Sequence, residues 1–307
     1  MPPQKNLNGL DKGNFDWGPV QADVSEMGDY QVADWVINQL NKDFNQPVFL
    51  GCGFFRPHLP WYVPPKYFEK FPLDEIILPT IKEDDLDDIP PFGVKVATVV
   101  GDHKAVIEHH QWKQAVQGYL ASINFMDDQL GRVLEAFEKR SDKDNWVIVL
   151  WSDHGWHLGE KLHWRKFALW EEATHNIMLW VVPGMTDPGG RCEEAVSLID
   201  IYPTLNDICG LKHLPQLEGT SLVPQLKAPK TPRDFPVLTT YLFKNHSLRD
   251  KRWRYIRYND GGEELYDHDK DSYEWTNLAQ KSEYKDVLEK MRKWLPEIVA
   301  EPVPRKK

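Results

Sequence analysis

The chain has 307 residues, of which 41% are hydrophobic and 12% aromatic, so it can bury a full core in one large domain or in a large and a small one. Its 37 basic and 47 acidic side chains give a formal net charge of −10. This charge argues against electrostatic binding of nucleic acid or of an anionic membrane over a wide surface. An anionic substrate would therefore have to be bound by a local group of cations.

Two further exclusions concern targeting and thiol chemistry. No run approaches the roughly 18–20 consecutive apolar residues of a membrane span, and the opening MPPQKNLNGLDKGNFDWGP lacks the apolar core of a signal peptide. We therefore expect no membrane segment, and nothing in this sequence directs export. The cysteines Cys52, Cys192 and Cys209 form no metal-type cluster and leave at least one thiol unpaired.

The first part of the chain predicts a helix followed by a strand. Residues 29–43 carry apolar side chains at helical spacing, and the apolar run PVFLGCGFF at 47–55 is typical of a buried strand. Closely spaced prolines over 56–79 favour an extended path, because proline forbids a long helix. The acidic run KEDDLDDIPP lacks the glycine turn of a calcium loop and is expected to be a solvated loop.

The middle of the chain alternates between helix and strand. Residues 111–140 predict a long amphipathic helix, and the run NWVIVLWSD after it is apolar on both alternations, as in a central strand of a sheet that is covered on both faces. A second such run lies at 176–184, and a helical pattern covers 197–211. This alternation predicts an α/β domain over residues 1–235.

After a link rich in proline and lysine, the pattern changes to short strands with the turn NDGG at 259–262. The segment SEYKDVLEKMRKWLPEIVA places Val287, Leu288, Met291, Trp294, Leu295 and Ile298 on one stripe, as expected of a helix that covers one face of that sheet. Residues 236–307 are therefore expected to form a small antiparallel sheet with a final helix.

The stretch WSDHGWHLGEKLHWRK at 151–166 is the richest in reactive side chains. In an open α/β sheet, ligands collect beyond the carboxyl ends of the strands, where Asp153 and His154 are expected. Gly155 is expected to allow a sharp turn there and Gly159 a second close approach. A cap at Asp153 and a core imidazole at His154 are the alternatives, but the nearby Lys166, Glu160 and Trp156 favour a site.

The run VIVLWSDHGWHLGEKLHWRKFALWEEATHNIMLWVVPG resembles the second half of sulfatases of the alkaline-phosphatase-like superfamily, of the iduronate-2-sulfatase type. FLGCGFFRPHLPWYVPPKYFEKFP, SLIDIYPTLNDICGL and the later hairpin resemble segments of the same family, in the same order over nearly the whole chain. The resemblance implies a sandwich with a mixed sheet between helices and hydrolysis of sulfate esters on a sulfated sugar or polysaccharide. Members of the family are usually secreted, periplasmic or lysosomal, and the sequence itself assigns no compartment.

By position, the resemblance makes Asp153 and His154 ligands of a calcium ion, His58 a catalytic histidine near the scissile oxygen and Lys166 a cation on the sulfate. A sulfate ester needs cations as charge moves onto the leaving oxygen, and a histidine can protonate the departing alcohol. Trp156 and His163 would line the pocket as substrate-binding residues, although roles in the core or behind the ligands are equally compatible with their types. Imidazole is an unusual ligand for calcium, which prefers oxygen.

The sequence departs from the family at its nucleophile. Members carry a first strand with two acidic metal ligands and a Cys-x-Pro-Ser-Arg type segment whose cysteine becomes formylglycine, and this sequence has neither. In CGFFR, Arg56 stands four residues after Cys52, but Phe54 occupies the place of Pro or Ala. We therefore expect Cys52 to be a buried strand cysteine, the fold to be incomplete at its N-terminal side, and the chain alone to be inactive.

Two alternatives stay open on sequence grounds. The superfamily shares its plan of metal and nucleophile, so a phosphoester or phosphonoester hydrolase is the first. The second is a non-catalytic chain that binds a glycan or complements another chain.

Overall fold

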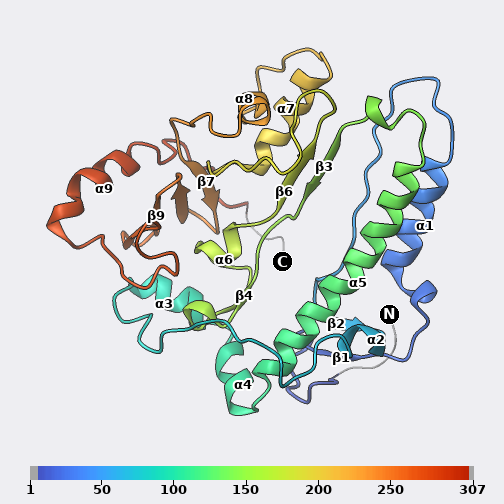
Figure 1. Ribbon diagram of the computed structural model, residues 1–307. Helices are drawn as coiled ribbons and strands as arrows, with labels where there is room; N and C mark the ends of the chain where they lie inside the picture. The colour runs from blue at the N-terminus through green and yellow to red at the C-terminus, as the bar shows by residue number, and fades with distance from the viewer. Residues whose placement is uncertain (1–5, 304–307) are drawn as a thin grey trace. The chain divides into compact units, whose positions relative to one another are not determined.

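The structure, a computed structural model, describes residues 6–303 (Figure 1). Internal contacts divide the chain into two compact units. The first comprises Met1–Pro79 and Gly101–Trp146, and the second comprises Thr80–Val100 and Val147–Lys307. The boundary predicted between residues 235 and 236 lies inside the second unit, just before the small sheet begins, and the division into 1–235 and 236–307 stays a prediction.

Two neighbouring helices that run in the same direction dominate the first unit (Figure 1). Helix α1 runs from Gly28 to Leu40 and α5 from Trp112 to Glu138, as their apolar spacing predicts. A short parallel pair, β1 (Trp17–Pro19) and β2 (Trp61–Val63), lies against α5. The other elements of this unit are η1 (Val24–Glu26), α2 (Pro65–Phe68), α4 (Asp102–Glu108) and η2 (Lys143–Asn145). Among residues 6–303, no helix is both long and apolar enough to cross a bilayer.

The expected buried strand over residues 47–55 is wrong. This segment forms no strand, and both Phe49 and Cys52 are exposed. At its end, the backbone N–H groups of Phe55 and Arg56 donate to the Asp29 carboxylate, at 2.8 and 2.9 Å, instead of to a neighbouring strand. An apolar run becomes a strand only where another strand supplies partners for its backbone, and none does so here within the described residues.

The strand that precedes Asp153 belongs to the second unit. Strand β3 (Ile148–Trp151) pairs antiparallel with β6 (Met178–Val181), which confirms both predicted strand positions. The expectation that both faces are covered is wrong, because Trp151, Leu179 and Val181 are exposed. Within residues 6–303 each of the two strands has a single neighbouring strand, and part of the apolar surface of the pair lacks a covering layer.

The rest of the second unit contains a short hairpin, several helices and a larger sheet. The hairpin consists of β4 (His157–Leu158), η3 (Glu160–Leu162) and β5 (Trp164–Arg165). The helices are α3 (Pro91–Thr98), α6 (Glu171–Thr174), η4 (Leu198–Asp200), α7 (Ile201–Ile208) and α8 (Val223–Lys227). Helix α7, preceded by η4, lies within the helix predicted over 197–211.

The predicted antiparallel sheet near the C-terminus is present, with strand order β10-β9-β8-β7. Its strands are β7 (Val237–Thr240), β8 (His246–Arg249), β9 (Trp253–Arg257) and β10 (Glu263–Asp267). The final helix, α9 (Lys285–Arg292), follows η5 (Ser282–Tyr284) and packs Leu288 and Met291 against this sheet. The helix is shorter than the predicted stripe, and Ile298 is exposed, because Pro296 disfavours helix in the residue before it.

Candidate functional site

Two candidate ligands, Asp153 and His154, follow the end of β3. The Nδ1 of His154 lies 2.7 Å from the carbonyl oxygen of Gly155 and donates to it, so Nε2 is the ring nitrogen left to face an ion. That Nε2 lies 3.5 Å from Oδ2 of Asp153. The side chain of Asp153 is 80% exposed and that of His154 is 27% exposed, so both donor atoms are open to an incoming ion.

This donor pair fits part of a cation site. Calcium binds its ligands at roughly 2.3–2.6 Å, so two donors that lie 3.5 Å apart can contact the same ion. A carboxylate oxygen suits a hard cation, whereas the imidazole suits it less well. Asp153 and His154 would thus hold one side of the ion, and the remaining ligands would have to come from other groups.

Two glycines shape the backbone near this pair, and their roles are exchanged relative to the prediction. The close approach occurs at Gly155 and the turn at Gly159. Gly155 does not adopt a positive φ; a Cβ there would lie 2.0 Å from the carbonyl oxygen of Glu172, so this position needs glycine for close backbone approach. Gly159 instead adopts a φ of 134° and begins the turn of the β4–β5 hairpin. The loop that carries the candidate ligands is therefore packed directly against α6.

The hairpin that leads to Lys166 has an unusual backbone. Lys161, Leu162 and Arg165 have φ values of 55°, 49° and 78°, in the left-handed region that residues with side chains rarely adopt. Such strain persists only where the surrounding structure imposes it, and it clusters at functional sites. Here the buried ammonium of Lys161 pairs with Asp85 at 2.9 Å, which anchors the turn of the hairpin.

Lys166 follows this hairpin directly. Its carbonyl accepts a hydrogen bond of 2.8 Å from the N–H of Ala168, and its ammonium lies 5.8 Å from the ring centroid of Phe167. Within the described part of the chain, no carboxylate forms an ion pair with this ammonium. The charge of Lys166 is therefore not neutralised by a neighbouring acid, as a group that binds an anion requires.

His58 belongs to the first unit and lies between two cis peptide bonds, Arg56–Pro57 and Leu59–Pro60. Its Nδ1 lies 2.7 Å from the carbonyl oxygen of Leu59, and its ring centroid lies 4.7 Å from that of Phe55. The guanidinium of the buried Arg56 donates to the His58 carbonyl at 3.2 Å. The ring is thus oriented from several sides, while its place in one pocket with Asp153 and Lys166 stays a prediction.

The two candidate pocket residues differ in their surroundings. The half-buried ring of Trp156 lies 6.3 Å from that of His154, next to the candidate ligands. His163 is buried, and its Nδ1 lies 3.0 Å from the carbonyl oxygen of Ala97. The structure thus supports a packing role for His163, whose ring also forms part of a cavity wall described below.

A residue that the sequence analysis missed is His157. Its ring is completely buried 5.1 Å from that of His163, and neither of its nitrogens has a hydrogen-bond partner among residues 6–303. Burial above all, and then His163 and Lys161, lower the pKa of His157 far below the usual value, so this ring is neutral. The spacing H-L-G-E-K-L-H, which places His157 in β4 and His163 directly before β5, is the one signal in the sequence that could have found it.

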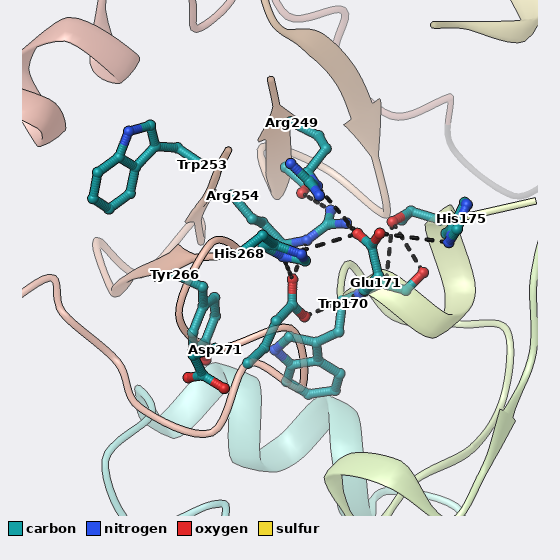
Figure 2. Close-up of polar contacts among 12 residues, drawn as sticks. Trp170, Glu171, His175, Arg249, Trp253, Arg254, Tyr266, His268 and Asp271 are labelled. Atoms are coloured by element: carbon teal, nitrogen blue, oxygen red, sulfur yellow. Dashed lines mark hydrogen bonds and ion pairs between the residues drawn. The ribbon is translucent and has the colours of Figure 1, made fainter. Parts of the chain in front are cut away.

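A second cluster has the composition of a metal site. One ligand atom from each of Glu171, His268 and Glu274 lies within 4.8 Å of the others. Figure 2 shows the side chains of Glu171 and His268 in this cluster. Arg254, however, forms ion pairs with both carboxylates. The Nε of Arg249 also lies 3.2 Å from Oε2 of Glu171. Because these guanidinium groups already balance the carboxylates, we interpret the cluster as a buried ion-pair network.

The protonation of this network supports the same interpretation. Burial alone would raise the pKa of Glu171, but Arg254 and Arg249 outweigh it and lower the pKa to about 2. Burial also opposes ionisation of Glu274, and there Arg254 and His268 hold the pKa below its usual value. Both carboxylates are therefore charged at neutral pH, and they tie strand β9 to α6.

Comparison with known proteins decides the family. Residues 4–211 match the family model described as sulfatase. The chain belongs to the sulfatase family. Residues 159–301 also match the model described as N-sulphoglucosamine sulphohydrolase, C-terminal.

Named proteins with similar sequences support the membership of this chain in the sulfatase family. A protein of Formosa agariphila named sulfatase is 40% identical over 285 residues, which cover 92% of this chain and 56% of the relative. Human iduronate 2-sulfatase is 27% identical over 234 residues, which cover 63% of this chain and 42% of the relative. The chain thus spans about half the length of the curated relatives that it matches.

A solved structure confirms the fold class. The phosphonate monoester hydrolase of Agrobacterium radiobacter superposes with a TM-score of 0.75 at 24% identity, over 92% of this chain and 62% of that one. The sulfatase-family chain therefore has the α/β fold of the alkaline-phosphatase-like type.

Proposed function

We propose that this chain forms part of an active site that hydrolyses sulfate esters on a sugar. The observation that carries the proposal is the donor pair after β3, with Oδ2 of Asp153 and Nε2 of His154 3.5 Å apart, in the same unit as the unneutralised Lys166. Membership of the sulfatase family supports the reaction class. The name of the human relative, iduronate 2-sulfatase, supports a sulfated sugar acid as substrate.

Each residue has a task in this reaction. Lys166 would hold a sulfate oxygen, because a preorganised cation stabilises charge that develops in the transition state. His58 would donate a proton to the departing alcohol oxygen, for which an oriented imidazole is suited. Asp153 and His154 would hold a calcium ion, which when bound supplies a Lewis acid for the sulfate oxygens. Trp156, beside His154, would line the sugar pocket.

The nucleophile of the family mechanism is a formylglycine, and none of Cys52, Cys192 and Cys209 lies in a segment of the required type. We therefore propose that these residues alone hydrolyse sulfate esters at no useful rate. A further segment or a complementing chain would supply the nucleophile. The exposed apolar side chains of the β3–β6 pair support such a partner, because a two-stranded sheet with an uncovered apolar face is marginally stable on its own.

One observation favours a second candidate. The fold similarity to a phosphonate monoester hydrolase, with a TM-score of 0.75, makes hydrolysis of a phosphonate or phosphate ester the alternative reaction. A chain that only binds sulfated glycans is the alternative outside the enzymes.

Purified chain should be assayed with 4-nitrophenyl sulfate and with a 4-nitrophenyl phosphonate ester, and its cysteines should be inspected by mass spectrometry for an aldehyde. We expect no turnover of either ester and three intact thiols. Turnover that survives replacement of all three cysteines would reveal another nucleophile. Turnover that is lost with Cys52→Ser alone would overturn the exclusion of CGFFR.

A further inference from the structure

A cavity of about 900 Å³ lies in the second unit, beside the segment that carries Lys166. Its walls come from α3, from the end of the β4–β5 hairpin, from the loop between β7 and β8, and from residues 299–302. Arg165 and Phe167 line it, whereas Lys166 between them does not. The cavity therefore lies beside the segment that carries Lys166 and does not include the Lys166 side chain.

Two aromatic side chains form an accessible part of the wall. The rings of Phe167 and Tyr241 are stacked with centroids 5.9 Å apart, and Phe167 is 47% exposed. Leu242, beside them, is 60% exposed. Flat aromatic faces of this kind bind the apolar C–H faces of sugar rings.

The loop that carries Tyr241 and Leu242 is rigidly held. Leu242 and Lys244 have φ values of 59° and 60°, a strained backbone for residues with side chains. The fully buried Asn245 maintains this shape: its Nδ2 donates to the carbonyls of Tyr241 and Phe243, at 2.9 and 3.2 Å, and its Oδ1 accepts from the N–H of Asn259 at 3.0 Å. The exposed apolar side chains are therefore preorganised.

The charges of the wall point to the chemistry of the ligand. The exposed Lys95 lines the cavity and no carboxylate among residues 6–303 does, in a chain whose net charge is −10. The ammonium of Lys95 lies 5.9 Å from the centroid of Phe92, and no described carboxylate forms an ion pair with it. A local excess of cations on an acidic protein attracts anions.

We propose that this cavity binds an anionic sugar unit, sulfated or carboxylated, that is linked to the unit whose ester is cleaved. The sugar ring stacks on the exposed ring of Phe167, whose other face packs on Tyr241, and its anionic group faces Lys95. This inference rests on the proposed function for the identity of the substrate, and it implies a saccharide of at least two units.

The test is calorimetric titration of the full chain with a size series of heparin oligosaccharides, from disaccharide to hexasaccharide. Phe167→Ala should weaken binding of the longer members about tenfold, as expected for the loss of a stacking face. Lys95→Gln should weaken binding less and reduce its dependence on salt. Tyr273→Ala and Lys281→Gln are the matched controls, an exposed ring stacked on Trp275 and an exposed lysine outside the cavity, and should stay within about twofold.

Failure of this inference is distinguishable from failure of the proposed function. Absence of binding to every oligosaccharide, or equal binding by Phe167→Ala, Lys95→Gln and the unsubstituted chain, would overturn the cavity assignment. Oligosaccharide binding that depends on Phe167 and Lys95, in a protein with no esterase activity under any condition, would retain the cavity and reject the sulfatase reaction. A neutral cellohexaose that binds as tightly as the heparin hexasaccharide would reject the anionic ligand.

Discussion

The guanidinium group of Arg254, on strand β9, forms an ion pair with the carboxylate of Glu171, the first residue of helix α6 (Figure 2). Arg254 is buried and its second partner is the buried Glu274. Only four residues separate Lys166 from Glu171, so this contact fixes one end of the segment that carries the candidate sulfate ligand. The small sheet thereby helps to position the candidate site.

Arg254→Met should destabilise the protein by about 3–5 kcal/mol, because it leaves two carboxylates without their principal counter-charge. Urea unfolding followed by tryptophan fluorescence measures the change. Lys285→Met removes an exposed pair with Glu289 and should change the free energy of unfolding by no more than about 0.5 kcal/mol. Equal effects of the two substitutions would contradict the assigned role of Arg254.

The same network predicts a dependence of stability on pH. The pKa of Glu171 in the folded protein is about 2, below the usual value for glutamate, because Arg254 and Arg249 outweigh the effect of burial. Stability from a depressed carboxylate is fully present above the unfolded pKa of about 4.3 and is lost as pH falls toward the folded value. Glu171→Gln should therefore flatten the fall in unfolding free energy between about pH 4.3 and pH 2. An unchanged slope in that window would show that Glu171 contributes nothing to it.

Gly155→Ala tests the packing of the loop that carries Asp153 and His154. Its Cβ would lie 2.0 Å from a backbone carbonyl oxygen that cannot rotate away, so we expect a loss of about 1–3 kcal/mol or more. Gly131→Ala, inside helix α5 and with no atom within 4 Å of the added Cβ, should instead stabilise by about 0.5–1 kcal/mol. Thermal unfolding of both variants provides the comparison, and a neutral Gly155→Ala would mean that this loop can move.

Much of the fold could be predicted because its elements have strong local patterns. Helix α5 and the β7–β10 sheet follow from apolar spacing and from the NDGG turn. The segment 47–55 was predicted wrongly because an apolar run does not reveal whether a neighbouring strand is available. Helix α9 ends early because Pro296 overrides the apolar stripe.

The candidate site was only partly accessible to sequence reasoning. Asp153, His154 and Lys166 lie in one short stretch after a predicted strand, so their residue types and position are enough to find them. The ion pairs of Lys161 with Asp85 and of Arg254 with Glu171 join residues 76 and 83 positions apart, so only the folded chain reveals them. His157 was missed because nothing in its residue type distinguishes a fully buried ring from an exposed one.

Cation binding by the chain should be weak. Asp153 and His154 supply two ligands, whereas calcium takes about 6–8, so we expect dissociation constants on the order of 10⁻⁴–10⁻³ M. Terbium, a calcium mimic, can be followed by luminescence sensitised through Trp156, whose ring lies 6.3 Å from that of His154. Asp153→Asn should abolish the signal and Asp207→Asn, at an exposed position of α7, should not. Nanomolar stoichiometric binding, or a signal indifferent to Asp153→Asn, would contradict the assignment.

The central proposal is that Asp153, Lys166 and His58 each serve the hydrolysis of sulfate esters. The most direct measurement is turnover of 4-nitrophenyl sulfate by a chimera in which this chain replaces the matching part of the Formosa agariphila sulfatase, to which it is 40% identical. We expect hydrolysis that falls about 10²–10³-fold in kcat with Lys166→Ala and similarly with Asp153→Ala or His58→Ala, while the exposed Lys281→Ala has no effect. A folded chimera that hydrolyses the sulfate ester at the same rate with and without Lys166 and Asp153 would contradict the account.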